Sequence, residues 1–399
     1  EADSTSIVST SGNDITLLGG VSTVNDTSGR KYVMWHWKAG GTTPTKTYKV
    51  KVVADSTDYG HGSGANKYQF FKSDGTTGFG TNGVDIDLQE GGTYVFDWSD
   101  STAQGHPLRF SLTNNGTHGG GSEYTTGVVK DDSAYKTTIT VASGVANLYY
   151  YCQLHSGMGA EVRTNTSHGS TNFDGSILSI EQASRESGFS IALFTGNATS
   201  GATVGHGLSS PLDMLIVKSR DSSSHNWITW HKNLSSGYFI NLNLTSAQIN
   251  APARFTTTVP TSTVFSLGND TSTNTNNDDY VAYCFHSVEG FSKFGTYTGN
   301  GSTDGTFVYT GFRPAWVMTK SISVSSSWRI NDGVRNPSNG VDANLYPNVS
   351  NAEDTGTVRM DFVSNGFKLK VSGGSHPNAS TNYIYMAFAE QPFKFSNAR

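Results

Sequence analysis

The sequence predicts an all-β protein built from tandem antiparallel β-sandwich modules, with one further β-sandwich inserted between them. Short apolar runs recur along the 399-residue chain, and stretches of Gly, Ser, Thr and Asn separate them, which is the pattern of strands and turns. Glycine is frequent, at 45 residues, and the 12% of aromatic residues suits sheets. From position 188 onward the sequence also repeats itself at a spacing of about a hundred residues, the usual size of one sandwich domain.

Five landmarks carry this repeat and recur in the same order. Each copy contains several short apolar runs with turn residues between them, so we expect one antiparallel sandwich at 188–289 and another at 290–399. The paired landmarks are Gly188-Phe189-Ser190 with Gly290-Phe291-Ser292, Thr195-Gly196-Asn197 with Thr298-Gly299-Asn300, Pro211 with Pro314, Trp227 with Trp328, and residues 280–285 with 383–388.

Residues 1–46 are interpreted as the closing half of a third copy, followed by a linker. Tyr32-Val33-Met34-Trp35 aligns with the last apolar run of each later copy, which predicts a buried strand at this place. The opening half of such a copy is missing, so we expect that Glu1 is not the encoded start of the protein. The stretch 164–187 begins with polar residues and is predicted to be a linker between modules.

Four potential metal ligands stand out between these segments. An apolar, aromatic run ends in Cys152, His155 follows three residues later, and Met158 comes three residues after that. His106 opens another strand-like run further upstream. A thiolate, two imidazoles and a thioether are the ligands of a mononuclear blue-copper site. A glycine-containing loop after a strand that ends at Cys152 would fold His155 and Met158 back around one point.

This part of the chain resembles the cupredoxins, and its short Cys-x-x-His-x-x-Met loop is typical of copper proteins in that family. The resemblance implies a cupredoxin-like β-sandwich at 47–163. It also implies that His106, Cys152 and His155 are equatorial copper ligands and that Met158 is the axial one. The alternative is a sandwich that keeps the shape and binds no metal, with Cys152 and Met158 as buried core residues.

A second resemblance, together with the first, covers nearly the whole chain. Residues 280–300, 311–316 and 385–393 resemble a repeat found in tail-fibre and other virion proteins of cyanophages and marine phages. Residues 105–111 and 119–128 are similar to a module that is inserted in the same virion proteins. These likenesses imply a phage structural protein that is displayed at the particle surface as a fibre, spike or other appendage.

Charge and hydropathy exclude several other classes of protein. The net charge is −5 and no run of Lys or Arg occurs, so nucleic-acid binding is not expected. No apolar segment approaches the length that spans a bilayer, so membrane insertion is not expected either. The two cysteines lie far apart, which argues against a disulfide framework. Low charge and Gly/Ser/Thr/Asn-rich loops favour an extracellular or virion surface.

Other residues offer weaker indications of a site. Asp85 and Asp87 share the outward face of a predicted strand, where they would form either a paired-acid glycosidase site or, as we favour, a solvated sheet face. Four tryptophans could stack on sugars, although their matched positions in the repeats favour core packing: Trp227, Trp230, Trp316 and Trp328. Structural roles are expected for His36, His231, His286 and Cys284.

Together these patterns predict a non-enzymatic surface protein of a phage virion, such as a tail fibre, that attaches to a host-cell glycan or protein. We expect it to self-associate as a homotrimer and to contact other virion proteins. Bound copper would act as a local staple, because a ligand that binds only the folded form stabilises it. Two alternatives stay open: a secreted copper-binding cupredoxin-type electron-transfer protein and a glycan depolymerase.

Overall fold

The computed structural model describes residues 7–11, 14–17, 31–39, 44–166, 169–372 and 377–391. Strands account for 40% of the protein and helices for 3%, and the strands form several separate sheets, so the predicted all-β class is confirmed. Within the described residues, no helix is both long enough and apolar enough to cross a membrane. The chain divides into two compact units, residues 1–38 and 39–399.

The N-terminal unit contains one described hairpin, in which β1 (Ile7–Ser11) pairs with β2 (Asp14–Leu17). The predicted buried strand at Tyr32–Trp35 is wrong, because residues 31–38 form no strand and Tyr32 is 46% exposed. In both later copies the matching strand lies between the first and third strands of its own copy. The described residues of the N-terminal unit supply no such pair, so the alternating pattern alone does not produce a strand here.

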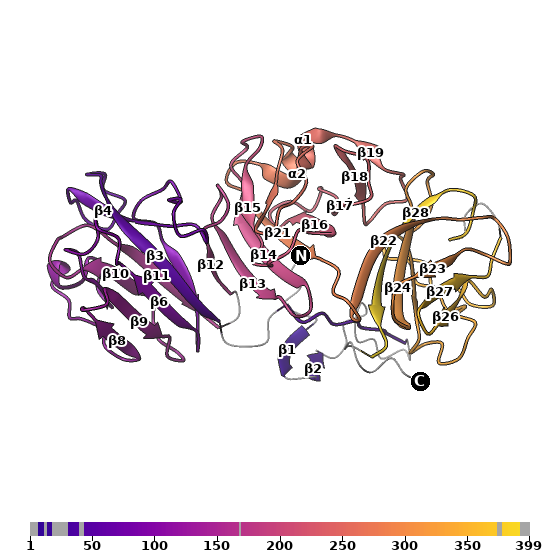
Figure 1. Ribbon diagram of the computed structural model, residues 1–399, viewed down its shortest axis with the longest axis horizontal. Coiled ribbons are helices and arrows are strands. Elements are labelled where there is room, and N and C mark those ends of the chain that lie inside the picture. Colours follow the sequence, from indigo (N-terminus) through magenta and orange to yellow (C-terminus); the bar gives the residue numbers. More distant parts are fainter. Residues whose placement is uncertain are drawn as a thin grey trace. The chain divides into compact units, whose positions relative to one another are not determined.

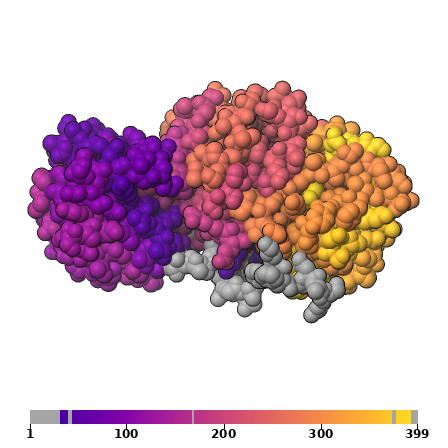
Figure 2. Space-filling view, viewed as in Figure 1, coloured from indigo at the N-terminus to yellow at the C-terminus, as the bar shows by residue number. Residues whose placement is uncertain are grey.

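Residues 44–166 form a two-sheet sandwich, called the first sandwich below, whose strands are drawn in Figure 1 and whose atoms are coloured indigo to magenta in Figure 2. One sheet has the order β4-β3-β6-β9-β8 and the other β5-β11-β10-β7. Aromatic side chains from both sheets meet in one core, among them Tyr48, Phe70, Phe96, Phe110 and Tyr150. The elements are β3 (Thr45–Ala54), β4 (Asn66–Phe70), β5 (Ile86–Gln89), β6 (Thr93–Asp97), β7 (Leu108–Ser111), the 3-10 helix η1 (Gly116–Gly119), β8 (Val128–Asp131), β9 (Lys136–Thr140), β10 (Leu148–Cys152) and β11 (Ala160–Asn165).

The predicted linker at 164–187 is wrong, because most of this segment is structured. β12 (Ser170–Asn172) pairs with β13 (Ser179–Ser184), and β13 pairs in turn with the first strand of the next module. Phe173 between them is 4% exposed and stacks on Phe70 of the first sandwich, with ring centroids 4.5 Å apart. Two buried apolar side chains, Phe173 and Ile177, therefore fix a stretch whose polar composition is typical of a linker.

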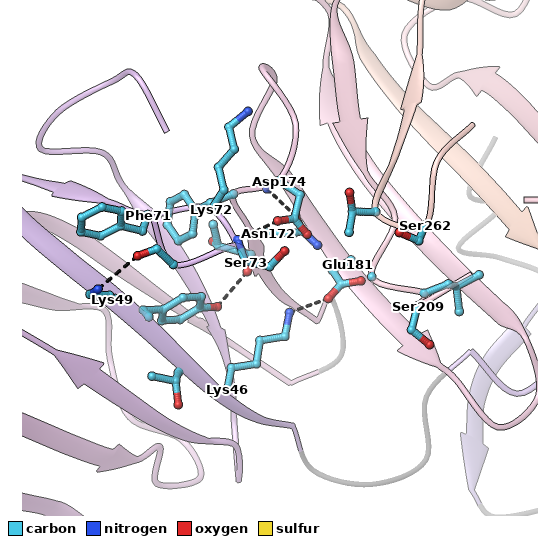
Figure 3. Close-up of a pocket in the computed structure, with 18 of the residues that line it drawn as sticks. Lys46, Lys49, Phe71, Lys72, Ser73, Asn172, Asp174, Glu181, Ser209 and Ser262 are labelled. Atoms are coloured by element: carbon cyan, nitrogen blue, oxygen red, sulfur yellow. Dashed lines mark hydrogen bonds and ion pairs between the residues drawn. The ribbon is translucent and has the colours of Figure 1, made fainter. Parts of the chain in front are cut away.

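The same segment lines a cavity of about 610 Å³, shown in Figure 3. Lys46 reaches into it and forms an ion pair with Glu181 at 2.6 Å, and the backbone N–H of Ser73 donates to Asp174 at 2.8 Å. These contacts engage Asp174 and Oε1 of Glu181, whereas Oε2 of Glu181 is buried without a hydrogen-bond partner. The cavity is lined by β3, by the segment that follows β11 and by residues 207–209 and 262–263 of the first repeat.

The two segments for which the sequence predicts a duplication, from residue 188 onward, have the same strand order (Figure 1). In each copy the first strand pairs with the last, the last with the third, and the third with the fourth; the second strand pairs with a late strand in a smaller sheet. The first repeat contains β14 (Phe189–Thr195), β15 (Thr203–Gly205), β16 (Met214–Ser219), β17 (Ile228–His231), β18 (Tyr238–Asn241), β19 (Ile249–Asn250), α1 (Pro252–Phe255), β20 (Val264–Ser266), α2 (Thr271–Asn274) and β21 (Asp279–Phe285). The second repeat contains β22 (Ser292–Thr298), β23 (Phe307–Tyr309), β24 (Pro314–Ser321), β25 (Arg329–Asp332), β26 (Met360–Val363), β27 (Gly366–Leu369) and β28 (Asn382–Ala389).

A fully buried asparagine occupies the same place in each repeat. Asn274 accepts from the backbone N–H of Asn197 at 2.8 Å, and Asn378 accepts from that of Asn300 at 3.1 Å. The Nδ2 group of Asn378 also lies within 2.6 to 3.0 Å of three acceptors, one of which is the carbonyl of Val371. Each asparagine therefore ties the turn after the first strand to the segment just before the last strand.

We expect Asn378→Ala to lower the free energy of unfolding by about 2–4 kcal/mol, because the backbone N–H of Asn300 and the acceptors around Nδ2 would lose their hydrogen-bond partner at once. Urea denaturation followed by circular dichroism measures this. The exposed Asn351 provides a matched control, and Asn351→Ala should change the free energy by less than about 0.5 kcal/mol. Equal effects of the two substitutions would contradict the proposed tie.

Two buried histidines make the first repeat sensitive to acid. Burial lowers the pKa of His206 to about 4 and that of His231 to about 3, from an ordinary value of 6.5. The Nδ1 atom of His206 accepts from the N–H of Leu208, and Nε2 lies 3.2 Å from the carbonyl of Thr261, so the folded state holds the neutral ring.

Stability should therefore fall as the pH drops from about 6.5 towards about 4, because the unfolded chain binds protons that the folded chain does not. Each histidine contributes a slope that approaches about 1.4 kcal/mol per pH unit inside this window. Denaturation curves recorded at several pH values measure the slope. In His206→Gln the difference in bound protons between the unfolded and folded states should fall by about one, which makes the slope shallower. An unchanged slope would show that His206 does not contribute.

Candidate metal centre

The strand pairing of the first sandwich brings the predicted ligands to one end of the second sheet. β10 pairs with β7 so that Cys152 lies opposite Leu108, and His106 precedes that strand by two residues. The next backbone contact, from the N–H of Gln153 to the carbonyl of Pro107 at 2.9 Å, continues this register beyond the strands. His155 then follows in the loop that connects β10 to β11.

Three of the four predicted ligands converge on one point. The Sγ atom of Cys152 lies 3.7 Å from Nδ1 of His106 and 3.5 Å from Nδ1 of His155, and one donor atom from each of the three residues lies within 4.8 Å of the others. The rings of the two histidines have centroids 4.5 Å apart. Among the described residues this is the group of His, Cys, Asp and Glu side chains that could hold a metal ion.

Met158, the fourth predicted ligand, is 1% exposed and belongs to the same core cluster as Cys152. Its carbonyl accepts from the N–H of Tyr68 at 3.0 Å, which fixes the backbone on the far side of the ligand loop. Its side chain is therefore enclosed in the same apolar core as the thiol, and a thioether is the group that copper sites use as a weak axial ligand.

The ligand loop is tightly enclosed by backbone. Gly157 has a φ of 73°, and a Cβ atom there would lie 2.6 Å from the carbonyl carbon of Ser63. A Cβ atom at Gly159 would collide with the carbonyl oxygen of Tyr150. Only glycine fits both places, so the short spacing between His155 and Met158 depends on close contact with neighbouring segments.

Asn115 holds the same loop from the side. Its Oδ1 accepts from the N–H of Gly157 and its Nδ2 donates to Oγ of Ser156, both at 2.8 Å. The backbone of Asn115 has a φ of 59°, a left-handed conformation that asparagine adopts more readily than most residues. Residues of this kind orient metal ligands without touching the metal.

Tyr68 and His118 complete the support of the three ligands. The hydroxyl of Tyr68 donates to the carbonyl of His106 at 2.6 Å, and Nε2 of His118 lies 3.1 Å from the carbonyl of Cys152. The sequence analysis did not single out Tyr68, Asn115 or His118. A usable signal for one of them was present, because the turn-forming sequence Asn114-Asn115-Gly116 lies three residues after the end of β7.

Burial shifts the pKa values of Cys152 and His106 in the metal-free protein. Burial raises the pKa of the Cys152 thiol above its usual value and lowers the pKa of His106, with a further lowering by the neighbouring His155. His106 is therefore a neutral imidazole at neutral pH and can coordinate directly. The thiol must lose its proton when a metal binds, so metal affinity should rise with pH.

The distances fit a single transition-metal ion. Bonds of about 2.0 Å to each nitrogen and about 2.3 Å to sulfur would separate sulfur from nitrogen by roughly 3.5–3.8 Å in trigonal or tetrahedral geometry. The two S···N separations of 3.7 and 3.5 Å fall in this range. One thiolate and two imidazoles with a weak axial thioether favour copper over the hard, oxygen-seeking cations.

Other predicted candidates lie elsewhere and have structural explanations. The expectation of a solvated face is wrong for Asp87, which is 6% exposed and accepts from Arg163 at 3.0 Å. Asp85 accepts from the N–H of Glu161 and contacts His61, so the two carboxylates bind protein donors and do not resemble a free acid pair. His36 lies in the segment 31–38, outside this cluster.

The residues for which we expected structural roles are mostly buried. Trp316 and Trp328 are 6% and 1% exposed, which agrees with core packing and removes them as sugar-stacking surfaces. Cys284, His231 and His286 are also buried in the first repeat. Trp227 and Trp230 are partly exposed, and Trp227 stacks on Tyr283 at 6.1 Å.

Comparison with known proteins addresses the part of the chain after the metal ligands. Residues 162–392 match a family described as "Domain of unknown function (DUF7483)". The chain belongs to this family. The DUF7483 region includes β12, β13 and both repeats, so the segment expected as a linker is part of the family's own domain. A search of the curated proteins found no match, and neither did a search of the solved structures.

We expect the purified protein to bind one equivalent of copper(II) and to show an intense visible charge-transfer band from the Cys152 thiolate. Cys152→Ser should abolish this band, and His155→Ala should weaken or shift it. Cys284→Ser removes the other buried thiol and serves as the control that keeps the band. Titration followed by visible absorption and electron paramagnetic resonance measures these outcomes, and a wild-type protein without copper uptake would exclude the site.

Proposed function

We propose that the first sandwich is a copper-binding module of the cupredoxin type, carried by a non-enzymatic structural protein of a phage virion surface. The observation that carries the copper assignment is the convergence of a buried thiol with two imidazole nitrogens at 3.5 and 3.7 Å. Met158 would supply the weak fourth ligand from the enclosed end of the same loop.

The structural role is supported by the way the chain uses its polar residues. The DUF7483 region repeats one sandwich twice, and its buried polar side chains hold turns and strand ends, as Asn274 and Asn378 do. The resemblance of the sequence to tail-fibre and other virion proteins of marine phages supports a location at the virion surface. In this role the chain would contact copies of itself, other virion proteins and a host-cell glycan or protein.

Copper fits this role as a staple for one module. The three ligands come from the residues before β7, from the end of β10 and from the loop after it, so one ion would tie together three points of the second sheet. An ion that binds only the folded state stabilises it by about 2.7 kcal/mol at a hundred times its dissociation constant.

Electron transfer is the second candidate function, and one observation favours it. His155 is exposed and its neighbour Leu154 is 60% exposed, so one ligand and an adjacent apolar side chain lie at the surface, where a redox partner could approach. Voltammetry of the copper-loaded protein separates the two roles. Fast, reversible reduction would favour electron transfer, whereas slow reduction with a large rise in melting temperature on copper addition would favour the staple.

The virion location makes a direct prediction. Antibodies raised against the isolated chain should label intact particles of the phage that encodes it, and electron microscopy should place the label on an external appendage. Antibodies against an internal virion protein provide the control, since they should label only disrupted particles. Labelling of disrupted particles alone, or of none, would contradict a role at the surface.

A further inference from the structure

Two large aromatic side chains lie exposed on one strand of the second repeat. Phe307 and Tyr309 of β23 are 47% and 63% exposed, while Val308 between them is 5% exposed and packs in the core. Successive side chains of a strand point to opposite faces, so the two rings share the outward face of the small sheet β23-β27-β26.

The first repeat lacks these rings. The equivalent strand β15 carries Thr203, Val204 and Gly205, and only its valine is matched in the second repeat. Val204 is fully buried, as the core requires. The small residues on β15 are covered by a neighbouring segment, because Gly205 is buried and a Cβ atom there would lie 2.1 Å from Oδ1 of Asn172. On β23, in contrast, both rings stay exposed and present apolar surface that the first repeat does not have.

Glycines lie next to both aromatic rings. Gly366 of β27 pairs with Tyr309, and a Cβ atom at Gly366 would lie 3.0 Å from Cε2 of Phe307. A Cβ atom at Gly311 would lie 3.6 Å from the hydroxyl of Tyr309. Because both rings lean over residues without side chains, neither is enclosed by neighbours, and each keeps a large apolar area in water.

Charged groups of both signs surround the rings on the same face. Lys368 pairs across the strands with Phe307 and, on its other side, with Asp361. Lys368 forms an ion pair with Asp304, and Lys370 lies 3.6 Å from Asp361. The patch thus offers apolar ring faces next to two ammonium donors and two carboxylate acceptors, without a net charge.

We propose that this face of the second repeat, defined by Phe307, Tyr309, Lys368, Lys370, Asp361 and Asp304, binds the pyranose units of a neutral polysaccharide. A sugar ring presents C–H groups to an aromatic face and hydroxyls, as both donors and acceptors, to its surroundings. An apolar protein surface would instead have to dehydrate two ion pairs without replacing their hydrogen bonds, which is costly. The inference rests on the proposed attachment role and names the surface through which it would act.

Affinity electrophoresis of the full chain in native gels that contain laminarin, xylan or galactomannan tests this surface. The wild-type protein should be retarded in at least one gel. Phe307→Thr introduces the residue that the first repeat has at this position, and Tyr309→Ala removes the second ring; each should weaken binding by about tenfold or more. Phe307→Trp keeps an aromatic ring and should keep the retardation, with a tryptophan fluorescence change on adding the sugar.

Tyr59→Ala is the matched control, because Tyr59 is an exposed tyrosine, at 43%, on the first sandwich and should not affect retardation. Far-ultraviolet circular dichroism and urea denaturation check that the variants fold. Absence of retardation in all three gels, or equal retardation of the wild type and Phe307→Thr, overturns the inference. The antibody labelling of particles tests the virion location separately, so failure of this sugar-binding surface would leave that result standing.

Discussion

The antiparallel pairing of β7 with β10 is the contact on which the candidate metal centre depends. It places the residue pair Cys152 and Leu108 opposite each other and thereby brings His106 to the thiol. A slip of one residue would turn Cys152 out of the core, because successive side chains alternate between faces. The register is held beyond the strands by the contact of Gln153 with Pro107 and by Tyr68, which binds the carbonyl of His106. The chemistry of the site is thus a consequence of sheet register.

The two repeats separate what the fold requires from what a surface can vary. Both keep the same strand order and a buried asparagine before the last strand, because these features close the sandwich. Val204 and Val308 fill the same core position, yet the residues beside them differ completely in size and polarity. The edge of β15 is also covered, through a bridge between Val204 and Ile177. The outward residues of β15 therefore lie next to another segment of the chain, whereas Phe307 and Tyr309 of β23 are exposed.

The fold class, the repeated strand order and the clustering of His106, Cys152 and His155 were predictable because each leaves a local pattern in the sequence. Alternating apolar runs, repeated landmarks and the Cys152-to-Met158 spacing depend on neighbours along the chain. The errors came from tertiary context. The composition of segment 164–187 is typical of a linker, but Phe173 and Ile177 are buried against other modules. The pattern of Tyr32–Trp35 is typical of a strand, but the described residues of the N-terminal unit contain no strands that pair with it. Tyr68 and His118 support the ligands through contacts with backbone carbonyls, which no spacing reveals.

The two free cysteines show why burial alone does not identify a metal site. Cys152 and Cys284 are both fully buried in the described structure, and burial raises the pKa of each thiol. Cys284 lies beside Ser190 in a sheet core, so its raised pKa only keeps an inert thiol protonated. Cys152 has the same desolvation, but two imidazole nitrogens face its sulfur. A metal cation offsets the cost of a buried thiolate, whereas an apolar core cannot, so the two histidines and not the burial of the thiol make Cys152 the candidate ligand.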